Sequence, residues 1–154
     1  MKLIPFVPAH AEALLADRLN EGCPEIVDDW AAWIGDLVNP DMAFTGVENG
    51  HLIGSAGLIR IWPGVSEAWF VGSWRLNNNV MSGARATRRK LDELMTAHEL
   101  HRIQAVVRAD WPAARRFARW LGMKEEGVMK AYGSDKQDYI RVAKIREISM
   151  LKGS

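Results

Sequence analysis

The sequence predicts an α/β fold: a single domain with a mixed central sheet that carries helices on both faces. Its 154 residues are a common size for one domain. Apolar residues alternate between helical spacing and short strand-like segments. Some strands are joined by tight hairpins and others by helices, so we expect both antiparallel and parallel strand pairs. The predicted order is β-α-α-β-β-β-α-β-α-β-β over residues 1–146, followed by a polar tail at residues 147–154.

The first third of the chain is predicted to be one strand and two helices. Residues 2–7 form a short apolar strand. The first helix begins at Pro8 and ends near Gly22, because proline suits a first helical turn and glycine a helix end. A second helix lies between Pro24 and Pro40, and we expect its apolar face to pack against the sheet. That face consists of Ile26, Trp30, Trp33, Ile34 and Leu37.

Three strands and a long helix follow. Residues 43–47 and 52–62 flank Asn49-Gly50, a dipeptide that strongly favours a hairpin turn. Pro63-Gly64 makes the next turn, into a strand at 67–76. Three asparagines then lead into a helix at 82–100. Its apolar face consists of Ala84, Thr87, Leu91, Leu94, Met95 and His98.

The last third is predicted to be a strand, a helix and a closing strand pair. The strand covers residues 103–108. Asp110 is a favourable N-cap for the helix, and Gly122 is its C-terminal stop. Residues 124–129 and 138–145 form the final two strands.

Composition excludes several classes of function. With 25% charged residues and a net charge of +1, neither nucleic acid nor an acidic membrane is expected as a partner. No stretch approaches the ~20 apolar residues of a membrane helix. The single cysteine, Cys23, argues against a disulfide framework and fits the reducing cytoplasm. No residues have metal-ligand spacing, so we expect a cytoplasmic protein without a metal.

The start of the helix at 82–100 is the strongest candidate for a binding site. Ser82, Gly83 and Ala84 are small, which lets backbone N–H groups approach a phosphate at the positive end of the helix dipole. Four positive charges follow within six residues, although basic side chains usually favour the other end of a helix. They are Arg85, Arg88, Arg89 and Lys90. The alternative is a solvated basic helix end without a ligand.

Two stretches carry a resemblance to a known family. Residues 110–127, DWPAARRFARWLGMKEEG, resemble the Asn-x-x-Ala-x-x-Leu-Tyr-x-x-x-Gly-Phe-x-x-x-Gly signature of the GNAT acetyltransferases. That family transfers an acetyl group from acetyl-CoA to an amine. Residues 69–76, WFVGSWRL, followed by Ser82-Gly83 and the basic helix, are more narrowly similar to GNAT-like proteins of tailed bacteriophages.

The resemblance implies acetyl-CoA as co-substrate and assigns residues to it. Ser82, Gly83, Ala84, Arg85 and Arg88 would hold the pyrophosphate. The backbone of Phe70, Val71 and Gly72 would bind the pantetheine arm where the fourth and fifth strands separate. Both motifs also depart from the family pattern: Val80 and Arg85 stand at the first and last positions of the phosphate loop, and Trp111 stands at the Asn position of the signature. The phosphate loop Arg/Gln-x-x-Gly-x-Gly/Ala matches only at Gly83, and Ala118 stands where the family often has a catalytic Tyr.

Two residues are the candidates for proton transfer. The attacking amine must be neutral, so a carboxylate near it can serve as general base, and Glu67 begins the strand that lines the separation. Tyr132 is the nearest substitute acid for the leaving thiolate. The alternatives are an exposed carboxylate at a strand end and a surface tyrosine in a turn.

Two functions therefore remain open. The first is N-acetyl transfer by direct attack of an amine, carried by a small molecule or a protein. The second is a catalytically weak or inactive GNAT-derived protein of phage assembly or host interaction, with a phage or host protein as partner. A phage-encoded chain would act in the cytosol of its bacterial host.

Overall fold

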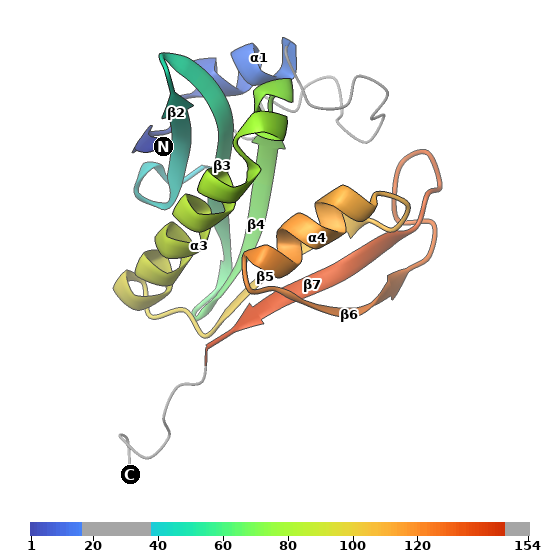
Figure 1. The fold of residues 1–154 in the computed structure, drawn as a ribbon. Helices are drawn as coiled ribbons and strands as arrows, with labels where there is room; N and C mark the ends of the chain where they lie inside the picture. Colours follow the sequence, from blue (N-terminus) through green and yellow to red (C-terminus); the bar gives the residue numbers. More distant parts are fainter. Residues whose placement is uncertain (17–37, 147–154) are drawn as a thin grey trace.

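The computed structural model describes residues 1–16 and 38–146 (Figure 1). The predicted second helix, with Trp30 and Trp33, lies outside these residues. So do the end of the first helix, Cys23 and the tail at 147–154.

The elements follow the predicted order wherever the structure describes the chain. The strands are β1 (Lys2–Pro5), β2 (Ala43–Glu48), β3 (His51–Trp62), β4 (Val65–Gly72), β5 (Arg102–Arg108), β6 (Lys124–Met129) and β7 (Tyr139–Ile145). The α-helices are α1 (Pro8–Ala16), α3 (Val80–Ala97) and α4 (Pro112–Trp120). Two short 3₁₀ helices, η1 (Pro40–Met42) and η2 (Trp74–Asn78), precede β2 and α3.

The strands form one seven-stranded sheet in the order β1-β2-β3-β4-β5-β7-β6. β4 and β5 are parallel, and the other neighbouring pairs are antiparallel, so the sheet is mixed as predicted. α3 connects the parallel pair. Asn49 and Gly50 both have positive φ, at 52° and 78°, which is the backbone of a type I′ hairpin turn between β2 and β3.

Helices cover both faces of the sheet, as predicted (Figure 1). Successive side chains of a strand point to opposite faces, so neighbours such as Ala43 and Phe44 belong to different cores. Phe44, Leu58 and Ile103 are buried with side chains of α3 and α4. Ala43 is buried with Phe6 and with Ala11 of α1 on the other face, where Trp69 also packs. The site below is therefore placed by a sheet with two differently covered faces.

Two predicted boundaries around α3 need correction. β4 ends at Gly72 rather than Leu76, because the Ser73 hydroxyl donates to the carbonyls of Leu52 and Ile53 and accepts from the Arg75 N–H, which caps η2. α3 begins at Val80 rather than Ser82, with Asn79 as N-cap, and ends at Ala97.

Asp110 was also predicted wrongly as the N-cap of α4. Its carboxylate accepts hydrogen bonds from Arg108 Nε at 3.0 Å and Nη2 at 3.2 Å. These charge-assisted bonds take the place of the capping bond, and the N-cap is Trp111, which makes no side-chain capping bond. Gly122 is confirmed as the C-terminal stop, since its φ of +93° is the left-handed conformation that glycine adopts freely.

Candidate functional site

The parallel strands β4 and β5 separate after a short stretch of pairing. They pair only at Val65–Arg102, Ser66–Ile103 and Glu67–Gln104. Beyond Glu67, β4 remains paired with β3 as far as Gly72, whereas β5 remains paired with β7 as far as Arg108. The facing edges of β4 and β5 therefore do not bond to one another there. Backbone N–H and C=O groups on such edges can bind an extended ligand.

Phe70, Val71 and Gly72 lie on the separated part of β4, where the sequence prediction put them. Phe70 is 41% exposed, and its ring lies 5.3 Å from that of Phe117 on α4, centroid to centroid. Both rings line a small hollow that also reaches Gly83 and Thr87 of α3. An apolar hollow thus lies between the end of β4, the first two turns of α3 and Phe117 of α4.

The backbone N–H donors at the start of α3 belong to residues 80–82, because the helix begins at Val80 and not at the predicted Ser82. The N–H of Gly83 donates to the carbonyl of Asn79 at 2.8 Å, and the hydroxyl of Ser82 donates to the same oxygen at 3.2 Å. The N–H groups of Val80, Met81 and Ser82 are the ones for which the helix itself supplies no acceptor. Together with the helix dipole they favour an anion.

Gly83 and Ala84 face the protein interior. Both are buried, and Ala84 belongs to the core beneath α3. A Cβ atom on Gly83 would lie 3.1 Å from Cδ1 of Leu76 in η2. The small size of Gly83 therefore has a packing explanation, independent of any phosphate.

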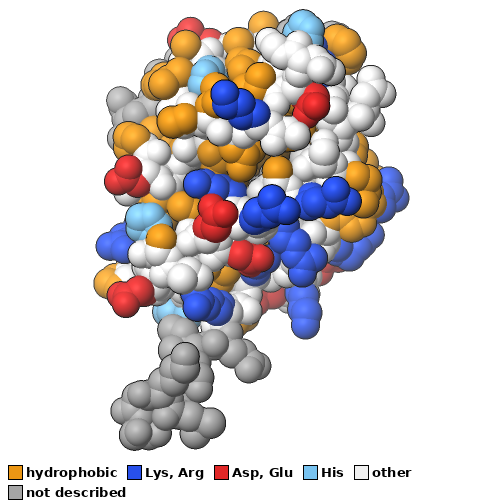
Figure 2. Space-filling view, turned by 60° about the vertical axis from the view of Figure 1, so that its left-hand side comes forward, with side chains coloured by type: hydrophobic (Ala, Val, Ile, Leu, Met, Phe, Trp, Pro, Cys, Tyr) orange, Lys and Arg blue, Asp and Glu red, His pale blue; other side chains and the backbone are white. Residues whose placement is uncertain are grey.

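The two predicted phosphate-binding arginines differ in their surroundings. Arg85 is exposed and makes no hydrogen bond or ion pair with the residues that the structure describes. Arg88 Nη1 donates to the Trp120 carbonyl at 3.4 Å, at the negative C-terminal end of α4. Arg85, Arg88 and Arg89 line a shallow depression on α3, and Figure 2 shows Lys and Arg side chains gathered across that side of the molecule. Of Arg85 and Arg88, Arg85 is therefore the side chain that can bind a ligand without first giving up a contact.

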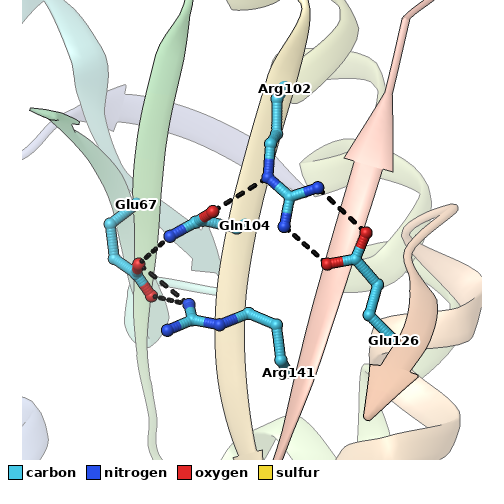
Figure 3. A network of polar contacts seen from close by, with 5 residues as sticks. All are labelled: Glu67, Arg102, Gln104, Glu126 and Arg141. Carbon is cyan, nitrogen blue, oxygen red and sulfur yellow. Dashed lines mark hydrogen bonds and ion pairs between the residues drawn. The ribbon is translucent and has the colours of Figure 1, made fainter. Parts of the chain in front are cut away.

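Glu67 occupies the last paired position before the strands separate. Its neighbour Ala68 packs against the core under α3 and α4, so Glu67 points to the opposite face. Its Oε1 and Oε2 each lie 3.0 Å from Arg141 Nη1, and Gln104 Nε2 donates to Oε1 at 3.0 Å (Figure 3).

This network extends across the sheet to β6. Arg102 Nε donates to Gln104 Oε1 at 2.8 Å, and both ends of the Arg102 guanidinium donate to the Glu126 carboxylate (Figure 3). The hydrogen bond from Arg102 lowers the pKa of Glu126 and, reciprocally, raises that of Arg102. The polar chain therefore crosses β4, β5, β7 and β6 on one face of the sheet.

Tyr132 lies elsewhere. It is 52% exposed in the turn after β6, and its ring packs edge-on against Tyr139 at 5.4 Å. Tyr139 pairs with Arg108, four positions along β5 from the Gln104 that contacts Glu67. At about 3.3 Å per residue this is roughly 13 Å along the strand. The structure does not bring the two predicted catalytic side chains together.

Arg141, Gln104 and Phe117 are site residues that the sequence prediction missed. Arg141 left a signal: it is a charged residue between Ile140 and Val142, both buried in the core. By strand alternation it had to lie on the other face, where its charge needs a partner. Its partner Glu67 is 74 positions away, which no local pattern reveals.

The described residues contain no group of three or more His, Cys, Asp or Glu side chains arranged to hold a metal ion. None of their helices is long and apolar enough to cross a membrane.

Comparisons with known proteins find structural similarity without sequence matches. No family model and no curated protein matches the sequence. Ribosomal-protein-alanine N-acetyltransferase from Brucella melitensis superposes with a TM-score of 0.74 at 19% identity, over 95% of this chain and 100% of that one. A mutant of spermidine N-acetyltransferase from Vibrio cholerae gives 0.72 at 18% identity, over 94% and 95%.

A third solved structure carries a family name. It is an acetyltransferase of the GNAT family from Bacillus anthracis, with a TM-score of 0.70 at 16% identity, over 93% of each chain. Likeness at such identities is evidence of a common fold. The chain has the fold of the GNAT-family acetyltransferases.

Proposed function

We propose that the protein transfers an acetyl group from acetyl-CoA to an amine. The observation that carries the proposal is the separation of β4 from β5 after Glu67, in a chain that shares its fold with acetyltransferases along nearly its whole length. An unpaired strand edge, an apolar hollow and a helix N-terminus follow one another there. An extended arm that ends in a diphosphate fits this order.

The chain supplies a matching group for each part of that co-substrate. Backbone groups of β4 at 70–72 bind the amides of the pantetheine arm, and Phe70 and Phe117 contact its apolar part. The N–H groups of Val80, Met81 and Ser82 bind the pyrophosphate. Arg85 adds a charge-assisted bond to a phosphate oxygen.

The chemical step joins the amine nitrogen to the thioester carbon while the carbon–sulfur bond breaks. Bound acetyl-CoA supplies the activated acetyl group, and the sulfur leaves as the thiolate. A backbone N–H of β4 stabilises the charge on the carbonyl oxygen. Glu67 takes the proton from the nitrogen, either directly or through a water molecule. Solvent protonates the thiolate, because Tyr132 lies near the other end of β5 from Glu67.

The acceptor carries an amine on a small molecule or on a protein. Proteins of similar structure include, by their descriptions, enzymes for ribosomal-protein alanine and for spermidine. The face of the sheet opposite α3 and α4 is where the acceptor approaches, because Glu67 points there. A panel of both kinds of amine is therefore the appropriate substrate screen.

The test has two parts, binding and turnover. Titration calorimetry with acetyl-CoA should give a measurable heat, and at 100 times Kd the ligand should stabilise the native state by about 2.7 kcal/mol. Release of the CoA thiol should then depend on an amine from the panel. The absence of both a binding heat and a thermal shift at millimolar acetyl-CoA would refute the proposal.

Binding without turnover would favour the second function, a catalytically weak or inactive GNAT-derived protein of phage assembly or host interaction. One observation favours it. Ala118 of α4, at the position where the family often has its Tyr, is 4% exposed in the hydrophobic core and provides no hydroxyl. Efficient acetylation of any amine in the panel would exclude this alternative.

A further inference from the structure

The Glu67 carboxylate is held by Arg141, and this contact adds a residue to the proposed mechanism. We infer that Arg141 is a positioning residue for acetyl transfer, which fixes the Glu67 carboxylate so that one lone pair of Oε2 faces the acceptor amine. The inference rests on the proposed function. It adds to that function a residue on β7 that is separated from β4 by β5.

The hydrogen-bond inventory of the carboxylate supports this role. An ionised carboxylate offers about four acceptor positions on its two oxygens. Within residues 1–16 and 38–146, Oε1 accepts from Gln104 and from Arg141, whereas Oε2 accepts only from Arg141. Oε2 thus keeps one acceptor position, and the Glu67 side chain is 31% exposed, so an amine or a water can reach it.

The second contact of Glu67 is itself held in place. Gln104 can donate to Glu67 because its amide oxygen accepts from Arg102 Nε, which fixes the orientation of the amide. Arg102 is in turn anchored by two bonds to Glu126 on β6. The carboxylate is therefore supported from β5 and from β7, and a catalytic group held in this way needs no reorganisation during the reaction.

The fold does not depend on the ion pair between Arg141 and Glu67. β5 and β7 are already joined by seven paired positions, from Arg102–Ile145 to Arg108–Tyr139. The side chains of Arg141 and Glu67 are 24% and 31% exposed, and an ion pair this close to solvent contributes little to stability. Yet Arg141 reaches past β5 to contact a residue of β4, at the position where the strands separate.

The first test compares turnover with binding. Arg141→Gln should lower kcat up to about 10²-fold, the effect of a misplaced catalytic group, while the Kd for acetyl-CoA and the Tm stay near those of the parent. Arg141→Lys should recover part of kcat, because an ammonium still donates to the carboxylate without the planar geometry of guanidinium. Arg146→Gln is the matched control: Arg146 directly follows β7, and its Nη1 donates to Thr96 Oγ1 at 3.0 Å, away from Glu67.

The second test is a double-mutant cycle. If Arg141 acts only through Glu67, then Arg141→Gln added to Glu67→Gln should cause no further loss of kcat. Additive losses, or a parent-like kcat in Arg141→Gln, would overturn the positioning role and leave acetyl transfer intact. A parent protein that acetylates no amine would overturn the proposed function and this inference together.

Discussion

At the scale of single residues, the two basic side chains of α3 that the sequence treated alike should behave differently. Arg85→Ala should weaken acetyl-CoA binding by about 1 kcal/mol, or ~5-fold in Kd, because one exposed charge-assisted bond to a phosphate is lost. Arg88→Ala should have a smaller effect, since its guanidinium already donates to the Trp120 carbonyl. Calorimetry measures the Kd for acetyl-CoA of both variants. An equal loss of affinity in the two would show that Arg88 leaves the Trp120 carbonyl to bind the ligand.

Glu67 allows a second prediction at this scale. A general base typically contributes ~10²–10⁴-fold, so Glu67→Gln should slow turnover by about that factor while acetyl-CoA affinity stays unchanged. Tyr132→Phe is the comparison, and its smaller expected effect follows from its place near the far end of β5. A larger loss of kcat in Tyr132→Phe than in Glu67→Gln would contradict this assignment of the proton transfer to Glu67.

At the scale of elements, η2 determines where α3 begins. The Ser73 side chain is 1% exposed and makes three hydrogen bonds, one to the N–H of Arg75 and two to carbonyls of Leu52 and Ile53. Ser73→Ala should therefore cost about 1–2 kcal/mol of unfolding free energy. It should also weaken acetyl-CoA binding, because Leu76 of η2 packs on Gly83 at the helix start.

The control for Ser73→Ala is Ser134→Ala, in the turn between β6 and β7, which should change neither quantity. Urea unfolding and calorimetry measure the two effects separately. Lost stability with unchanged affinity for acetyl-CoA would show that η2 supports the fold without placing the binding site.

Local signals explain which elements the sequence could predict. Asn49-Gly50 and Gly122 specify their own backbone conformations, and both were predicted correctly. Asn79 is a residue type that favours N-caps, yet its side chain makes no capping bond and its amide instead donates to the Arg75 carbonyl at 2.9 Å, and the start of α3 was missed. The N-cap of α4 was missed because Asp110 bonds to Arg108 instead. Both errors come from competition between side-chain partners, which composition and spacing do not resolve.

At the scale of the whole molecule, the separation of β4 from β5 divides the sheet into two parts. β1–β4 form one part and β5–β7 the other, joined at three paired positions. The Glu67–Arg141 pair and the Phe70–Phe117 contact connect the parts on opposite faces. The sequence predicted the separation through the family resemblance, but the residues that connect its two sides are far apart in the chain and needed the three-dimensional structure.

The attachment of α1 to the sheet makes the stability of the whole molecule depend on pH. His10 Nδ1 accepts the N–H of Val7 at 3.3 Å and lies 2.7 Å from the hydroxyl of Thr45. That hydroxyl in turn lies 2.7 Å from Ser55 Oγ, and both hydroxyl-bearing side chains are buried. An Nδ1 that accepts a hydrogen must be unprotonated, so protonation there would break the contact with the Val7 N–H, whereas the Thr45 hydroxyl can also accept from a protonated Nδ1.

Burial lowers the pKa of His10 from its ordinary value of 6.5. The unfolded chain then binds this proton more readily than the folded one, so unfolding free energy should be constant above pH ~6.5 and should fall as the pH drops from there through the lower folded pKa. The carboxylates whose pKa is lowered in the folded protein lose their contribution mainly at lower pH. The pKa values of Asp110, Glu125, Glu126 and Asp138 are lowered by their partners from 3.8 or 4.5, so their losses occur at lower pH.

Urea unfolding at pH 7.5 and pH 5 measures the effect, and two variants attribute it. His10→Asn places an amide oxygen near the position of Nδ1 and does not titrate, so its unfolding free energy should change less between the two pH values than that of the parent. His51→Asn, at the exposed tip of the β2–β3 hairpin, should keep the parent's pH dependence. A parent equally stable at both pH values would refute the attachment through neutral His10, and an unchanged slope in His10→Asn would assign the loss to another group.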